Sequence, residues 1–173
     1  PLTMGLRAFE SEVQSCKDEL EDVLGRPVLG YRAPCFSLDR ERLAVLEKVG
    51  LKYDSSRILF GDHPLYGDLD VGGFHERLPG IYCHGDFFEF EISTLPFAGK
   101  QIPVSGGGYL RIFPWVTMKM LLKRYLAKHP VYVLYIHPFE TSSQPNPILP
   151  SEASRANRFR FSWGRPGVLR KLE

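Results

Sequence analysis

The 173-residue chain is long enough for one globular domain and too short for two of ordinary size. Its 43% hydrophobic and 24% charged residues are ordinary globular usage, which excludes overall disorder. The net charge of +2 gives no reason to expect a nucleic-acid partner, and no apolar run is long enough to span a membrane. The three cysteines form no Cys-x-x-Cys motif, which favours a reducing, cytoplasmic compartment over secretion.

The chain begins with the pattern of an amphipathic helix. Apolar residues recur at steps of three and four between Leu6 and Val23. We expect this helix to have its N-cap at Thr3 and to end at Gly25. Residues 28–31 then predict a short apolar strand that ends at Arg32. Pro34 stops any continuation of this strand.

The same helix-then-strand pattern recurs twice. A second helix is predicted near residues 43–49 and leads into Asp54. A third is predicted at 114–125, followed by an apolar run at 131–136 that reads as a strand buried on both faces and ends at His137. Three such units predict a parallel sheet covered by helices.

A single domain is assigned to residues 1–173, with a long insertion at about 57–113. The first half of the insertion is rich in Gly, Asp and Pro and is predicted to be loop. Its second half contains strand-like segments at 87–92 and 101–104. Near the carboxyl end, residues 155–171 carry six basic and no acidic residues, which favours a solvated tail over a phosphate-contacting segment.

Each predicted strand of the three units ends in a polar or ionisable residue, namely Arg32, Asp54 or His137. Active sites of α/β proteins lie at the carboxyl ends of the strands. We therefore expect these side chains to cluster around a common cavity, with Arg32 shielded from solvent by a carboxylate partner. The pattern alone fits equally well the alternative that polar residues simply occupy turns.

The strand count limits the fold. About five strands can be counted, fewer than a closed parallel barrel requires, and a covering helix normally follows a strand. We therefore expect an α/β fold that is part of a barrel and is left open, because strands that precede Pro1 are missing. Residues 28–31 would then lie at an open sheet edge.

Segments at the three strand ends resemble the motifs of a known family. Residues 30–36, Gly-Tyr-Arg-Ala-Pro-Cys-Phe, resemble the Arg-x-Pro motif of polysaccharide deacetylases, the NodB-homology domain of carbohydrate esterase family 4. Residues 53–56 resemble that family's next, Asp-containing motif, and residues 135–138 resemble its histidine motif. The order of the motifs and their placement at strand ends agree with the family.

Three further segments resemble a branch linked to bacterial exopolysaccharide production, and these are residues 63–67, 103–109 and 137–140. The resemblance covers most of the chain, up to about residue 140. It implies a distorted (β/α) barrel and hydrolysis of N-acetyl groups from an amino-sugar polysaccharide. The implied partner is a carbohydrate, and the implied cofactor is a divalent metal, usually zinc.

The resemblance also implies roles for individual residues. His137 would protonate the leaving amine, and Asp54 would orient or tune His137. Arg32 would hold the aspartate that acts as base. The backbone N–H of Cys35 would help to bind the oxyanion. The glycine-rich segment at residues 106–108 lacks nucleotide-binding spacing, so a close approach to the substrate or a bend is the better interpretation. We assign Gly107, Gly108 and Tyr109 to substrate binding.

Two motifs of the family, the paired aspartates and a histidine pair three or four residues apart, are not found in this chain. We therefore expect the base and all metal ligands upstream of Pro1, and no activity from this chain alone. Asp62, His63, Asp68 and Asp70 could form a metal site, but a polar loop is the better interpretation. The alternative functions are a non-catalytic carbohydrate-binding module and a short protein that completes its barrel with a partner chain.

Overall fold

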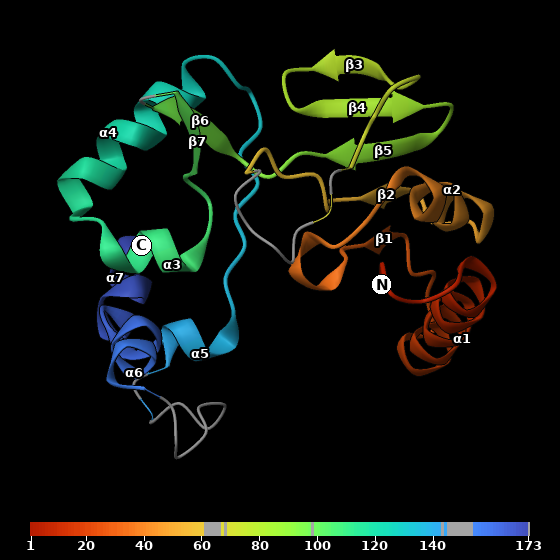
Figure 1. The fold of residues 1–173 in the computed structure, drawn as a ribbon, viewed down its shortest axis with the longest axis horizontal. Coiled ribbons are helices and arrows are strands. Elements are labelled where there is room, and N and C mark those ends of the chain that lie inside the picture. The colour runs from red at the N-terminus through yellow and green to blue at the C-terminus, as the bar shows by residue number, and fades with distance from the viewer. Residues whose placement is uncertain (61–66, 68, 98, 143, 145–153, 173) are drawn as a thin grey trace.

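The computed structural model describes residues 1–60, 67, 69–97, 99–142, 144 and 154–172, without the side chains of 156, 157 and 160. Figure 1 shows the described chain in two parts. We call the part formed by residues up to 92 the sheet lobe and the part from residue 93 onward the helical lobe. A mixed sheet organises the first part, and a hairpin with several helices forms the second.

The described residues of the sheet lobe form a sheet of five strands in the order β1-β2-β5-β4-β3. The pairs β1–β2 and β2–β5 are parallel, and the pairs β5–β4 and β4–β3 are antiparallel. The strands are β1 (Gly30–Tyr31), β2 (Tyr53–Asp54), β3 (His75–Leu78), β4 (Ile81–His84) and β5 (Phe87–Phe90). The segment predicted as an insertion therefore supplies three strands of the main sheet. The predicted edge position of residues 28–31 is confirmed for β1, which ends the strand order.

Two amphipathic helices pack against this sheet. Helix α1 (Leu6–Leu24) ends at Gly25, whose φ of 63° lets its N–H bond Glu21 O, as the sequence predicts. The predicted N-cap is wrong, because Gly5 rather than Thr3 occupies that position. Helix α2 (Arg40–Lys48) is capped by the Asp39 side chain, which accepts from Arg42 N. The core that they share is Phe9, Val13, Ala33, Leu38, Leu43, Val45, Leu46, Leu51, Leu69 and Phe87.

In the part of the helical lobe that the structure describes, a hairpin is combined with five helices. Strands β6 (Thr94–Phe97) and β7 (Lys100–Pro103) are antiparallel. The helices are α3 (Gly107–Ile112), α4 (Trp115–Leu126), α5 (Pro138–Thr141), α6 (Arg155–Ser162) and α7 (Val168–Leu172), with short 3₁₀ turns η1 (Pro34–Phe36) in the sheet lobe and η2 (Arg165–Gly167) here. A separate core contains Leu95, Val104, Leu110, Met118, Tyr125 and Val168. The described helices include none that is long and apolar enough to cross a membrane.

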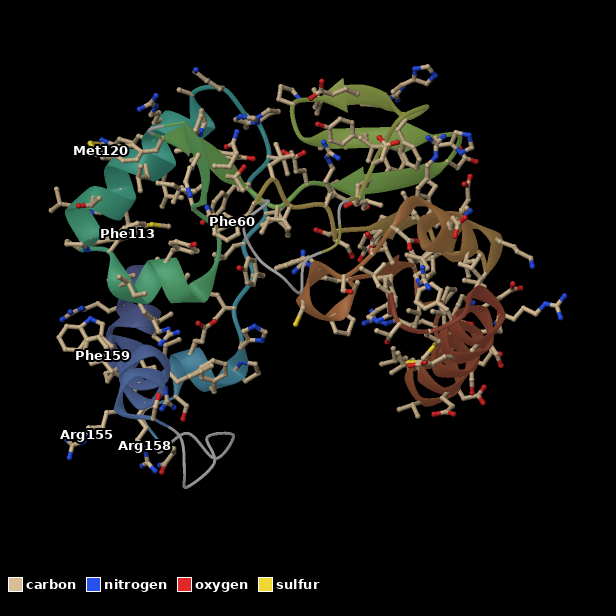
Figure 2. All side chains as sticks on the ribbon, in the orientation of Figure 1. Phe60, Phe113, Met120, Arg155, Arg158 and Phe159 are labelled. Atoms are coloured by element: carbon tan, nitrogen blue, oxygen red, sulfur yellow. The ribbon has the colours of Figure 1, made fainter. Side chains whose placement is uncertain are left out.

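A third apolar cluster lies between the two lobes, and we call it the central cluster. Its buried members are Phe36, Ile58 and Ile92, and its half-buried members are Phe60, Val133 and Tyr135. Phe60 is labelled in Figure 2, between the two halves of the molecule. An isolated parallel bridge between Ile58 and Ile92 extends the pairing of the sheet towards this cluster.

The predicted strand at 131–136 is wrong. The segment makes one isolated bridge, Gly106 with Tyr135, and its residues are half-buried. Its side chains alternate between two cores, because Tyr132 and Ile136 pack on the helical core whereas Val133 and Tyr135 join the central cluster. Apolar burial on both sides is thus achieved by side-chain packing without a strand ladder.

The predicted solvated tail is confirmed only in part. Residues 155–172 form α6, η2 and α7, and the basic residues Arg155, Arg158 and Arg170 are exposed, but Arg165 and Lys171 are not. Arg165 is buried and donates to Phe139 O at 2.6 Å and to Gln144 O at 2.7 Å. Lys171 Nζ donates to Leu110 O and Phe113 O at the carboxyl end of α3. These cations satisfy backbone carbonyls instead of facing solvent. The described residues form an α/β fold with no closed barrel.

Candidate functional site

Arg32 follows β1 and is tied to the strand beside it. Its Nε donates to Ser55 O and its Nη2 to Ser55 Oγ, both at 2.8 Å. Because Tyr31 pairs with Asp54, the ends of β1 and β2 bring Arg32 and Asp54 to the same edge of the sheet. The expected shielding is wrong, since Arg32 is exposed and its bonds go to a serine rather than to a carboxylate.

The turn after Arg32 has an unusual backbone. Cys35 and Phe36 have φ values of 53° and 52°, and two consecutive left-handed residues other than glycine are rare. The turn is anchored where Ala33 N donates to Ser56 Oγ at 2.8 Å. Within the described part of the chain, no acceptor is bonded to the N–H of Cys35. The thiol of Cys35 is exposed and free.

Asp54 is buried at the end of β2, 0% exposed. It accepts from Ser56 N on Oδ2 and from Ser56 Oγ on Oδ1, each at 2.9 Å. Ser56 Oγ in turn receives the bond from Ala33 N that anchors the turn. In the described residues Asp54 thus orients the turn that follows Arg32 and makes no bond to His137.

A second buried carboxyl lies beside Asp54. Glu89 on β5 is also 0% exposed, and its Oε1 accepts from Ser56 N at 3.0 Å and from Arg57 N at 2.8 Å. The N–H of Ser56 therefore bonds both acids. Among the described residues, Glu89 Oε2 is the buried side-chain oxygen to which no donor is bonded.

Burial raises the pKa of both acids, and the adjacent Asp54 charge helps to raise that of Glu89 to about 9. A hydrogen bond from Glu89 opposes the rise at Asp54. Glu89 is therefore the member of the pair that holds a proton at neutral pH, and the hydrogen bond between the two side chains lowers the pKa of Asp54 and raises that of Glu89.

Sequence reasoning missed Glu89. The signal was present in the alternation of β5, where Phe87 and Glu89 share the buried face and Phe88 and Phe90 the half-buried one. An acid at an inward position of an aromatic strand requires a partner. That partner could not be read from β5 alone, because Asp54 lies on another strand.

His137 is the N-cap of α5, with its imidazole exposed. The ring stacks on Phe139, with centroids 5.6 Å apart and an interplanar angle of 16°, and meets Tyr135 edge-on at 6.4 Å. No bond joins His137 to Arg32 or Asp54 among the described residues. The two parts of the candidate site meet through Phe36 and Tyr135, whose rings are 5.1 Å apart. The expected common cavity stays a prediction.

The glycine-rich segment begins α3 and lies against residues 135–140, which contain His137. Gly107 N donates to Tyr135 O at 3.0 Å. A Cβ on Gly107 would lie 2.1 Å from Glu140 Oε2, so the missing side chain makes room for Glu140. Tyr109 packs on Phe113, with ring centroids 5.9 Å apart. Contact of Gly107, Gly108 and Tyr109 with a substrate stays a prediction.

Of the four residues considered for a metal site, only Asp70 lies in the described part of the chain. Asp62, His63 and Asp68 lie outside the described residues, and Asp70 is exposed beside Arg40, with Nη1 to Oδ2 at 3.5 Å. Nowhere in the described ranges do three His, Cys, Asp or Glu side chains form a group that could hold a metal. The divalent metal, with its ligands expected upstream of Pro1, stays a prediction, and no chemical step below is assigned to it.

The family model "Domain of unknown function (DUF3473)" matches residues 56–173, which is more than half of the chain. The chain belongs to this family. The DUF3473 match begins at Ser56 and contains Glu89 and His137, whereas Arg32 and Asp54 precede it. No curated protein and no solved structure matches the chain.

Proposed function

We propose that this DUF3473 chain forms part of a hydrolase that removes N-acetyl groups from an amino-sugar polysaccharide. The observation that carries the proposal is the 5.1 Å contact between the rings of Phe36 and Tyr135. Phe36 ends the turn that follows Arg32, and Tyr135 lies two residues before His137. Two segments that resemble separate motifs of one deacetylase family are therefore neighbours in space.

In the proposed reaction a water oxygen bonds to the acetamide carbon and the C–N bond breaks. The products are acetate and a free amine, so the departing nitrogen must receive a proton. We assign this proton to the imidazole of His137, which is exposed and held between two aromatic rings. A general base takes the proton of the water, and the resemblance assigns that role to an aspartate held by Arg32.

The left-handed turn supports a place for the oxyanion. Tetrahedral intermediates are stabilised by N–H groups that are fixed before the reaction. The Cys35 N–H lies in a strained turn, and such strain is concentrated at active sites. Asp54 acts in this proposal as a positioning residue, because Ser56 links its carboxylate to the backbone of the turn.

Acetate release from an N-acetylated amino-sugar oligosaccharide tests the proposal, with the full-length protein that contains this chain. His137→Ala should lower kcat by about a hundred-fold or more, the usual contribution of a positioned acid. His84→Ala is the matched control, because His84 is another exposed histidine and contacts Glu47 in the sheet lobe. Unchanged turnover in His137→Ala would overturn the proposed function.

One observation favours a non-catalytic carbohydrate-binding module as a second candidate. Phe159 and Trp163 are 59% and 55% exposed, and their rings are 4.9 Å apart. Phe159 lies on the outer side of the helical lobe, near the labelled Arg155 and Arg158 (Figure 2). Exposed aromatic rings offer an apolar face to a sugar. This function predicts that Trp163→Ala weakens polymer binding, that His137→Ala does not, and that no acetate is released.

A further inference from the structure

The two carboxylate oxygens of Glu140 accept hydrogen bonds from two different segments, the backbone of His137 and a side chain of helix α3. The residue is 2% exposed. Its Oε2 accepts from His137 N at 3.0 Å, and Glu140 N donates back to His137 O at 2.9 Å. Its Oε1 accepts from Arg111 Nε at 3.1 Å. The backbone of His137 is thereby joined to Arg111 through one buried carboxylate.

Arg111 is itself held in place, and it reaches the histidine by a second route. Its Nη1 donates to Trp163 O at 3.2 Å, and its guanidinium lies over the ring of Phe139, 5.9 Å from the centroid. The Phe139 ring stacks on the imidazole of His137. One buried arginine therefore contacts the groups that fix the backbone and the ring of His137.

Helix α3 begins in close contact with this network. Gly107 leaves the space that Glu140 Oε2 occupies, and its N–H bonds Tyr135 O. Both charged side chains are almost completely buried, because only 6% of the Arg111 side chain and 3% of the Glu140 side chain are exposed. A buried ion pair is weak evidence for stability, because the loss of hydration offsets much of its attraction. The geometry that the pair imposes is the better account of its presence.

We infer that Arg111 is a positioning residue for His137 and acts through Glu140 and Phe139. The inference rests on the proposed function, in which His137 delivers a proton to the departing amine. A proton donor must be held close to its working position, since a displacement of about 1 Å can cost a factor of about a hundred in rate. Arg111 contributes to this placement without touching the substrate.

Arg111→Lys is the decisive variant, because lysine keeps the charge but cannot place several donors in the fork of a guanidinium. We expect kcat for acetate release to fall by about ten-fold to a hundred-fold, with KM nearly unchanged. Glu140→Gln should give the same pattern, and it serves if Arg111→Lys does not fold. Arg42→Lys is the matched control, because Arg42 is a buried arginine paired with Asp39 in the sheet lobe and should leave kcat unchanged.

The double variant separates positioning from a general structural role. In the His137→Ala background, Arg111→Lys should lower kcat no further, because the group that it positions is gone. An equal fold loss in both backgrounds would overturn the inference and leave the proposed function intact. Unchanged kcat in His137→Ala alone would instead overturn the proposed function.

A spectroscopic measurement tests the inference without activity. The imidazole proton resonances of His137 should shift or broaden in Arg111→Lys, because the stacked and capped arrangement is loosened. Those of His84, on β4 of the sheet lobe, should stay in place. A His137 spectrum identical to that of the unmodified protein would refute positioning by Arg111.

Discussion

The two lobes bury charged groups in opposite ways. In the sheet lobe, Asp54 and Glu89 are two acids that both accept a hydrogen bond from the N–H of Ser56. A proton on Glu89 removes the repulsion between two negative charges. In the helical lobe, Arg111 and Glu140 are opposite charges in direct contact. A shared proton makes the first pair sensitive to pH, whereas the second pair depends on charge itself. The same substitution, glutamate to glutamine, should therefore have very different effects in the two lobes.

The largest effect is expected in the helical lobe. Glu140→Gln removes the carboxylate and leaves the Arg111 charge buried without its counter-ion, which should lower the free energy of unfolding by roughly 4 kcal/mol. Urea unfolding followed by far-UV circular dichroism measures the change. A loss below about 1 kcal/mol would show that the Arg111 charge is not left buried without compensation.

The central cluster tests whether the two lobes unfold together. Ile92→Ala removes a side chain that is 0% exposed, which should cost roughly 3 kcal/mol. Both tryptophans, Trp115 and Trp163, lie in the helical lobe, so their fluorescence reports on that lobe. In Ile92→Ala the fluorescence transition should separate from the circular dichroism transition. Coincident curves would show that other contacts couple the lobes.

Glu89→Gln should have little effect near pH 6, because an amide can replace the protonated carboxyl as a donor to Asp54. The pKa of Glu89 is raised on folding, so the folded state binds more protons than the unfolded state above the ordinary glutamate pKa of about 4.3. The free energy of unfolding should fall relative to Glu89→Gln as the pH rises from there to about 9. Urea midpoints across this range measure the difference, and parallel curves would contradict the shared proton.

The smallest effect is expected at an exposed ion pair. Lys48 Nζ lies 2.7 Å from Glu10 Oε1, joining α2 to α1 at the surface, and the Lys48 side chain is 66% exposed. Lys48→Ala should change the free energy of unfolding by less than about 1 kcal/mol. A larger loss in urea unfolding would mean that surface charge contributes to the sheet lobe as much as its buried pair.

Local patterns in the sequence predicted local structure well. The apolar spacing of residues 6–23 predicted α1, and the same spacing predicted α4 after Pro114. The end of α1 at Gly25 was predictable because the left-handed cap depends on one residue type. Each of these elements is determined by residues that are close together in the sequence.

The errors arose where a residue's partner lies far away in the sequence. The basic residues Arg165 and Lys171 looked like solvated charges, because the carbonyl groups that they bond belong to distant segments. Glu89 was missed for the same reason, since its burial depends on Asp54 and on the backbone after it. Gly107 suggested a bend, but glycine is required there because the carboxylate of Glu140 occupies the space that a side chain would fill.

The extended segment at 131–136 has a mechanical consequence. Val133 and Tyr135 belong to the central cluster, and Tyr132 and Ile136 belong to the helical core on the same short length of backbone. A hinge motion that separated the lobes would have to pull one of these sets of side chains out of its cluster. The segment therefore acts as a tie that resists hinge opening, and through Tyr135 it connects the ring of Phe36 with the ring of His137.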